Sequence, residues 1–141
     1  MKENLTLRER YLQDPLAVRI GGLAANLARV GSFSNHPRHE HVVAGMLEES
    51  KWFIEWTTAG APPETQELLV QCQRQLARWQ VGWSEIWQDA NRRAEVAESA
   101  RVWSGRLLEA SGLLEPSGAA AAGGTEPNYG IQPLPQGPRR G

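Results

Sequence analysis

Apolar residues in the second half of the chain recur at steps of three and four, the spacing of one face of an α-helix. This stripe consists of Leu69, Cys72, Leu76, Trp79, Trp83 and Ile86. Pro63 favours a helix start upstream, because the missing N–H of proline costs nothing in the first turn. We therefore expect one continuous helix over about residues 63–88, with Trp79 and Trp83 buried and Trp87 beyond the buried seam.

Three further stretches show the same spacing and predict three more long helices. Their stripes are Leu16, Ile20, Leu23, Leu27 and Val30; then Val43, Met46, Leu47, Ser50, Phe53, Ile54 and Thr57; then Val96, Ala100, Trp103, Leu107, Ala110 and Leu114. A shorter pattern within residues 1–13 predicts a short helix across one end of the domain. No period-two alternation of β-branched residues competes with these elements. The predicted fold class is all-α, an antiparallel four-helix bundle with a short N-terminal helix.

Capping residues and glycines predict how these helices begin, end and pack. The expected N-caps are Asp14, Asn35 and either Asp89 or Asn91. Gly31 and Gly112 are expected to end the second helix and the last one. Gly21 and Gly22 lie inside the second helix, where glycine costs about 1 kcal/mol. They indicate either a close approach of a neighbouring helix or a local weakness.

Composition divides the chain into a domain and a tail. Of 141 residues, 40% are hydrophobic, and the net charge is −1. From residue 115 the sequence is rich in Gly, Ala and Pro, a composition that buries too little apolar surface to order itself. We expect a helical domain over residues 1–114 and a disordered tail over residues 115–141. The tail holds Pro135-Gln136-Gly137-Pro138-Arg139-Arg140, a P-x-x-P-x-R pattern typical of segments that bind polyproline grooves, so the tail is a candidate recruitment segment.

Charge and hydropathy exclude several classes of protein. A nucleic-acid binder needs a basic balance or a basic stripe, and fifteen Lys and Arg against sixteen Asp and Glu provide neither. No apolar run approaches the roughly 20 residues that span a bilayer, and the N-terminus lacks the apolar region of a secretory signal. The single cysteine, Cys72, lies on a helical stripe, where a thiol acts as a small hydrophobe. These features indicate a soluble cytoplasmic domain without nucleic-acid or membrane partners.

Motifs of catalytic chemistry are absent from the sequence. It contains no nucleophile elbow, no phosphate-binding loop, no zinc-protease motif and no Glu-x-x-His pair of a di-iron bundle. The three histidines are His36, His39 and His41, and the first two have a spacing that places ligands on one helix face. Pro37 lies among them and no second ligand cluster exists, so a solvated helix start is the favoured interpretation. We expect no catalytic residue, no metal and no cofactor, and hence no enzyme.

One pattern is typical of ribonucleases. Arg29 and His36 are separated by six residues, which resembles the Arg-x(4–6)-His element of the helical HEPN ribonucleases. The polar residue that usually follows the arginine is replaced by Val30, and nothing else in the chain matches. RNA cleavage is therefore the least favoured function.

The predicted bundle gathers polar and aromatic side chains at one end. If the third and fourth helices form a hairpin near Gly60, His39 faces Trp83. The candidate ligand-binding residues at this end are His36, His39, Trp83 and Arg29, and the candidate partner-binding residues there are Trp87, Arg92 and Arg93. Core indoles with a polar rim explain the same pattern, so a small-ligand or metal-binding bundle is the alternative function.

The leading hypothesis is a non-enzymatic module that docks a protein partner or a second copy of itself. Six Trp residues are many for a domain of this size. Trp52 and Trp56 lie one helical turn apart and beside the main stripe of their helix, which predicts an exposed aromatic patch. Exposed apolar patches beyond a few hundred Å² mark interaction surfaces.

Two segments of the chain resemble small helical proteins of photosynthetic bacteria. These segments are Tyr11-Leu12-Gln13-Asp14-Pro15-Leu16-Ala17-Val18-Arg19 and Glu49-Ser50-Lys51-Trp52-Phe53-Ile54-Glu55-Trp56. The resemblance covers about residues 5–114 and leaves out the tail. No activity is assigned to those proteins, so the resemblance implies a bacterial cytoplasmic setting and no site.

Overall fold

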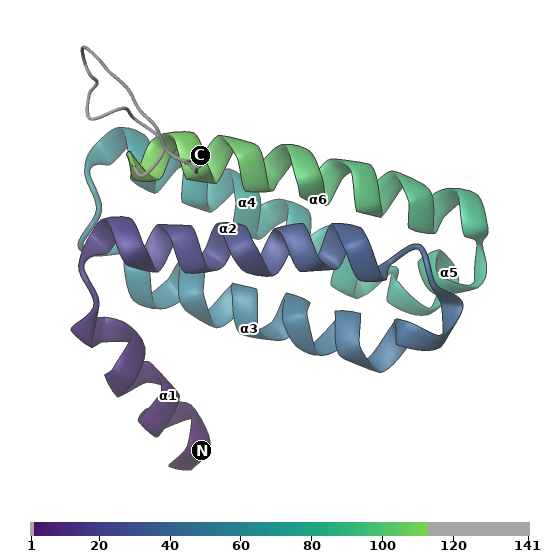
Figure 1. Cartoon of the computed structure of the whole chain (residues 1–141), viewed down its shortest axis with the longest axis horizontal. Coiled ribbons are helices and arrows are strands. Elements are labelled where there is room, and N and C mark those ends of the chain that lie inside the picture. The colour runs from purple at the N-terminus through teal and green to yellow at the C-terminus, as the bar shows by residue number, and fades with distance from the viewer. Residues whose placement is uncertain (1, 113–141) are drawn as a thin grey trace, which may run out of the picture.

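The computed structural model of the chain describes residues 2–112, with side chains from Thr6 onward (Figure 1). Its elements are α1 (Lys2–Gln13), α2 (Leu16–Phe33), the 3₁₀ turn η1 (Pro37–His39), α3 (Glu40–Thr58), α4 (Pro63–Val81), α5 (Trp83–Gln88) and α6 (Ala90–Ser111). All of them are helical, and residues 2–112 contain no strand, which confirms the all-α class. The tail expected over residues 115–141 lies outside the described residues.

The four long helices α2, α3, α4 and α6 lie side by side along the longest axis of the molecule, and α1 leaves them at an angle (Figure 1). α2 has the most extensive packing, first against α6 and then against α3. α3 also packs against α4 and contacts α1, and α5 packs against α6. None of the helices within residues 2–112 is both long and apolar enough to cross a bilayer.

The two ends of α6 agree with the sequence. The Asp89 carboxylate accepts hydrogen bonds from the backbone N–H groups of Asn91 and Arg92, at 2.9 and 3.3 Å. This is the N-cap geometry that satisfies donors of the first turn. Gly112 follows the helix with φ of 80°, the left-handed conformation that glycine adopts without strain.

The starts of α2 and α3 differ from the sequence-based expectation. Asp14 does not cap α2, because Pro15 has an extended ψ of 156° and itself occupies the N-cap position. Asn35 does not cap α3, because the turn η1 precedes that helix. His36, the residue before Pro37, has extended dihedrals, as sterics before a proline require, and so the α-helix begins only at Glu40.

The helix expected over residues 63–88 is broken at Gly82, so the prediction of one continuous helix is wrong. α4 ends at Val81, Gly82 adopts φ −97° and ψ 20°, and α5 begins at Trp83. The break changes which side chains after it face inward. Trp83 is only half-buried, whereas Trp87 is 5% exposed. The expectation that Trp83 is buried and Trp87 lies beyond the seam is therefore reversed.

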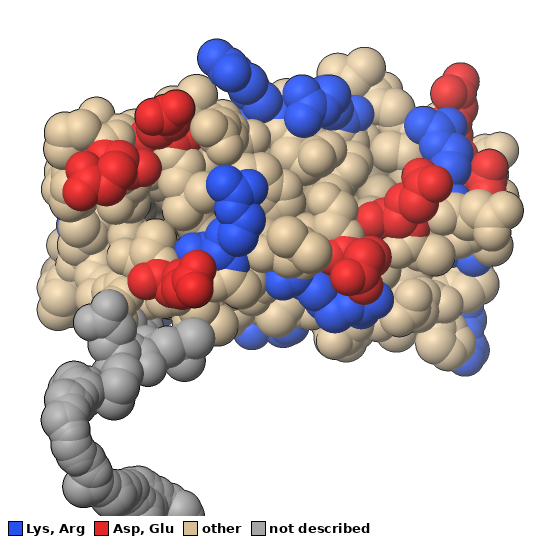
Figure 2. Space-filling model, turned by 90° about the horizontal axis from the view of Figure 1, so that it is seen from above, with Lys and Arg blue, Asp and Glu red and all other residues tan. Residues whose placement is uncertain are grey.

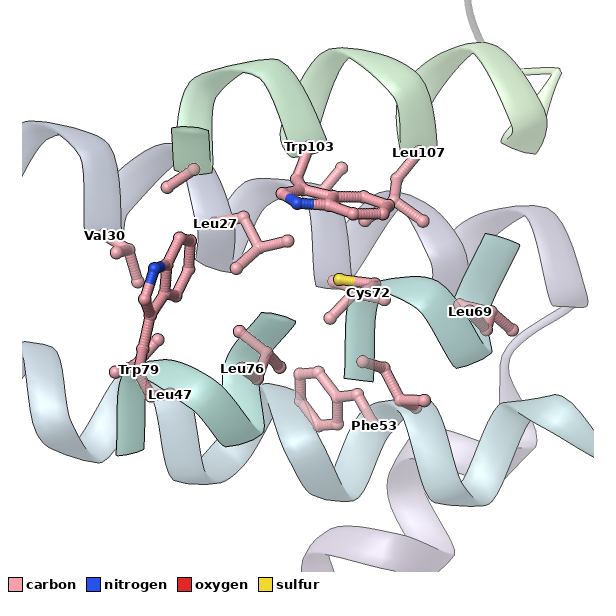
Figure 3. Close-up of a cluster of buried hydrophobic side chains, with 14 of the residues drawn as sticks. Leu27, Val30, Leu47, Phe53, Leu69, Cys72, Leu76, Trp79, Trp103 and Leu107 are labelled. Atoms are coloured by element: carbon pink, nitrogen blue, oxygen red, sulfur yellow. The ribbon is translucent and has the colours of Figure 1, made fainter. Parts of the chain in front are cut away.

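The core lies between the four long helices (Figure 3). Figure 3 shows Leu27, Val30, Leu47, Phe53, Leu69, Cys72, Leu76, Trp79, Trp103 and Leu107 turned toward one another. Cys72 belongs to the same core cluster as Trp103 and is fully buried. Burial raises the pKa of the Cys72 thiol to about 12, so the side chain stays a neutral thiol at physiological pH and acts as a hydrophobe.

A close approach joins α2 to α6, at Gly31 and not at Gly22. A β-carbon at Gly31 would lie 2.8 Å from Arg101 Cγ and 3.1 Å from the Ala97 carbonyl oxygen, and nothing lies within 4 Å of one at Gly22. α2 continues to Phe33, so the expectation that Gly31 ends the helix is wrong.

The same interface holds one buried and one partly buried hydrogen bond. The Ser104 hydroxyl of α6 donates to the Ala24 carbonyl of α2 at 2.7 Å, and Arg101 Nη1 donates to the Gly31 carbonyl at 3.2 Å. Small side chains at Ala24 and Ser104 are therefore needed where the two backbones come together.

A buried amide links α2 to α3. Asn26 is 2% exposed; its Nδ2 donates to Glu49 Oε1 at 3.0 Å, and its Oδ1 accepts a hydrogen bond from Arg29 Nη2. The arginine and the glutamate are thus bridged by a neutral group. Buried polar groups that keep their partners in only one arrangement favour a single register between helices.

We expect Gly31→Ala and Gly22→Ala to change stability in opposite directions. Overpacking costs about 1–3 kcal/mol and alanine recovers up to about 1 kcal/mol of helix propensity, so Gly31→Ala should lower the free energy of unfolding by roughly 1–2 kcal/mol. Gly22→Ala meets open space and should raise it by roughly 0.5–1 kcal/mol. Urea denaturation measures both. Equal effects of the two substitutions would contradict the close approach at Gly31.

Candidate functional site

The side of α3 that faces away from the core carries two indoles. Trp52 and Trp56 are half-buried, and their rings stack with centroids 5.9 Å apart at an interplanar angle of 25°. Glu48 and Glu55 lie on the same side of the helix and are exposed. We call the surface formed by Glu48, Trp52, Glu55 and Trp56 the outer face of α3.

Aromatic residues behind this face support Trp56. The Trp56 ring lies 5.9 Å from the Tyr11 ring and 6.2 Å from the Phe53 ring, and Tyr11 stacks on Phe53 at 4.2 Å. Tyr11 belongs to α1, so this contact fixes α1 against α3. Trp56 is therefore held on one side by packed rings and exposes part of its indole on the other.

The Tyr11 hydroxyl joins three helices. It donates to the Arg19 carbonyl at 3.0 Å and lies 2.8 Å from Thr57 Oγ1. Because its only proton goes to the carbonyl, Thr57 must donate to the phenol oxygen. Burial is the largest effect on the phenol and raises the pKa of Tyr11 to about 12.

Charged groups surround Trp52. Lys51 Nζ lies 5.5 Å from the Trp52 ring centroid and 3.3 Å from Glu48 Oε1. The same glutamate oxygen accepts a hydrogen bond from Gln80 Nε2 of α4 at 3.2 Å. The exposed Glu55 adds a second carboxylate. The outer face thus combines stacked indoles with two acids and already accepts one cation near an aromatic ring.

The candidate partner residues Trp87 and Arg93 lie together at the other end of the molecule. Trp87 Nε1 donates to the Pro37 carbonyl at 2.8 Å. The Arg93 guanidinium lies 5.5 Å from the Trp87 ring centroid and donates to the Trp87 carbonyl. Because the indole is buried and its N–H is paired, Trp87 offers a partner little surface. Its contacts hold α5 against η1 and α6.

Arg92 lies apart from this pair. It is exposed, its Nη1 lies 3.8 Å from Glu85 Oε1, and it lines a hollow of about 270 Å³. The remaining lining residues are Gln75, Trp79, Ile86, Glu95, Val96 and Ser99, from α4, α5 and α6. The five candidate partner residues thus divide among three places.

The candidate ligand residues are only partly brought together. His36 is exposed and its ring lies 5.2 Å from that of His39, which meets Phe33 edge-on at 5.1 Å. Arg29 pairs with Asn26, as described above. Within residues 2–112, His, Cys, Asp and Glu form no group of three or more that could hold a metal ion.

Trp83 lines a hollow of about 260 Å³ together with Ala44, Leu47, Glu48 and Gln80. Trp83 thus lies beside residues 44–48 in the first half of α3, more than one helical turn beyond His39, the residue expected to face it.

Several buried polar atoms near Trp87 have no hydrogen-bond partner. They are Ser34 Oγ, His39 Nδ1, Trp83 Nε1 and Arg93 Nε. The Trp83 ring lies 5.2 Å from that of Trp87, His39 is the last residue of the η1 segment to which Trp87 donates, and Ser34 lies three residues before that segment. Native proteins pair nearly all such atoms with protein groups, water or a ligand. We call these four residues the polar end.

Sequence reasoning identified Trp52 and Trp56 but missed Tyr11, Glu48 and Glu55. Helical spacing was the available signal for the two acids, because they lie four residues before and three after Trp52. No local signal marks Tyr11, which reaches Trp56 only through the fold.

Comparison of the chain with models of protein families, with curated proteins and with solved structures finds no match.

We expect the stability of the chain to fall at alkaline pH, less steeply in Tyr11→Phe. The folded pKa of Tyr11 is about 12, above its ordinary value of 10.0, so the unfolded chain loses the proton first. This contribution to stability is present in full below pH 10 and is lost as pH rises from 10 to 12. Urea denaturation at pH 8 and at pH 11 measures the loss in both proteins. Identical losses would contradict a protonated, buried Tyr11.

Proposed function

We propose that the chain is a non-enzymatic protein-interaction or assembly module and that the outer face of α3 is its docking surface. The observation that carries the proposal is the stacked, half-exposed pair of Trp52 and Trp56. Indoles are enriched among the residues that supply most of the energy of protein interfaces. Tyr11 and Phe53 hold Trp56 in place, which reduces the side-chain entropy lost on binding.

The proposed framework for this surface is an antiparallel four-helix bundle of α2, α3, α4 and α6. Short connections support it, because α3 and α4 are joined by residues 59–62 only and α4 reaches α6 through the short α5. Connections of this length favour antiparallel neighbours. Such a bundle presents α3 as a rigid helix with one side free for a partner.

The proposed partner is a protein chain and not a nucleic acid. On the face in Figure 2, acidic and basic side chains are interspersed, and no continuous basic stripe crosses it. Nucleic-acid binding depends on clustered basic residues. The proposed setting is the cytoplasm, as the single cysteine suggests.

The test compares Trp52→Gln with Trp103→Gln in the full chain. Trp52 lies on the surface, so its replacement should change the free energy of unfolding by less than about 1 kcal/mol. Trp103 is 9% exposed and belongs to the core, so its loss should cost about 3–5 kcal/mol. Light scattering over a range of concentrations should show self-association of the wild type that Trp52→Gln weakens. A monomeric wild type, together with a large loss of stability in Trp52→Gln, would contradict the proposal.

A second candidate function is small-ligand binding at the polar end, favoured by its unpaired buried atoms. The N–H groups of Trp83 and Arg93 are hydrogen-bond donors and suit an anionic ligand. We expect inorganic phosphate to change the tryptophan emission of the wild type. A change on addition of Zn²⁺ would indicate that His39 binds the metal ion. Trp83→Phe should reduce the response. An unchanged spectrum with both additions would remove this candidate.

A further inference from the structure

The outer face of α3 combines two stacked indoles with two exposed acids, Glu48 and Glu55. We propose that it binds the proline- and arginine-containing segment of residues 133–140 of the same chain. This inference rests on the proposed function, since it names the occupant of the same docking surface. The segment reads Pro133-Leu134-Pro135-Gln136-Gly137-Pro138-Arg139-Arg140.

The first argument is the apolar complementarity of the two parts. Proline-rich segments favour an extended polyproline conformation and bind surfaces lined by aromatic rings, because little conformational entropy is lost when they dock. Trp52 and Trp56 provide two stacked rings, 5.9 Å apart, on the exposed side of one helix. Prolines at positions 133, 135 and 138 give the segment three rigid apolar groups for this surface.

The second argument is charge. Glu48 and Glu55 lie on the outer face, whereas Arg139 and Arg140 end the segment and residues 127–141 contain no acid. The Lys51 ammonium already lies 5.5 Å from the Trp52 ring centroid, so this face accommodates a cation beside an indole. A guanidinium pairs with carboxylates in a planar, two-pronged geometry that an ammonium lacks, and also stacks on aromatic rings.

The third argument is reach. Residues 113–132 separate the end of α6 from the segment and span on the order of 65 Å when extended, at about 3.3 Å per residue. α3 has 19 residues, so it is only about 28 Å long. Figure 1 shows α6 ending at the end of the molecule where α3 gives way to α4, and Trp56 lies near that end of α3. Every part of the outer face is within reach.

The tether also favours the segment of the same chain over that of a second copy. A linker long enough to span two sites holds a binding segment at an effective concentration in the millimolar range. At such a concentration even a weak contact between the prolines and the indoles forms within one chain. The segment therefore competes with other occupants of the face, and self-association of the wild type through this face requires that a second copy displaces the segment.

Fluorine NMR of the full chain labelled with fluorotryptophan tests this inference. The chain gives one resonance for each of its six indoles, assigned by Trp→Phe substitutions. We expect the double variant Arg139→Glu, Arg140→Glu to shift the resonances of Trp52 and Trp56 and to leave those of Trp79 and Trp103 in place. Glu126→Lys, which changes a charge of the tail outside the segment, is the matched control and should shift none. Adding Glu55→Arg to the double variant should move the Trp52 and Trp56 resonances back toward their wild-type positions.

Two outcomes would overturn the inference. Unchanged Trp52 and Trp56 resonances in the double variant would mean that the segment does not contact the face. A shift accompanied by a halving of the light-scattering mass would mean that the segment binds a second copy. Neither outcome depends on the Trp52→Gln stability test, so a failure here is separable from a failure of the docking surface itself.

Discussion

The close packing of α2 against α6 is the constraint on which the other contacts depend. At Gly31 the helices approach so closely that a β-carbon would displace its neighbours, and Ser104 donates to the Ala24 carbonyl along the same interface. α2 is held against α6 in this way and also packs against α3. The buried Asn26 of α2, which donates to Glu49 of α3, favours one register between these two helices. α3 in turn packs against α4 and α1, and the side of α3 left over carries the half-exposed indoles.

Much of this fold was predictable because apolar periodicity depends on burial, and burial dominates helix formation in proteins. Within residues 2–112 every residue of the four long stripes lies on a helix, although the stripe from Leu69 to Ile86 is divided between α4 and α5. The break at Gly82 was not predictable, since one glycine costs only about 1 kcal/mol and tertiary contacts decide whether the helix continues. The anchor of α5 is the hydrogen bond from Trp87 to Pro37, and these residues are 50 positions apart.

The candidate site shows the same division between local and distant information. The spacing of Trp52 and Trp56 placed them beside the buried stripe, and they are half-buried in the structure. Their contact with Tyr11 depends on the angle between α1 and α3, and the spacing of residues within a helix does not predict that angle. The polar end was anticipated as a gathering of indoles, imidazoles and guanidiniums. Its hydrogen bonds and unpaired atoms depend on side-chain geometry that a helical stripe does not specify.

The rate at which a reagent labels the single thiol of the chain reports how often the core opens. Cys72 is fully buried in the core between the long helices, so a thiol reagent reaches it only when these helices separate. Labelling by such a reagent follows the population of the open state when reclosing is fast, and the opening rate when labelling is faster than reclosing. The transient opening of the core is therefore measurable in the given sequence, without a substitution that introduces a probe.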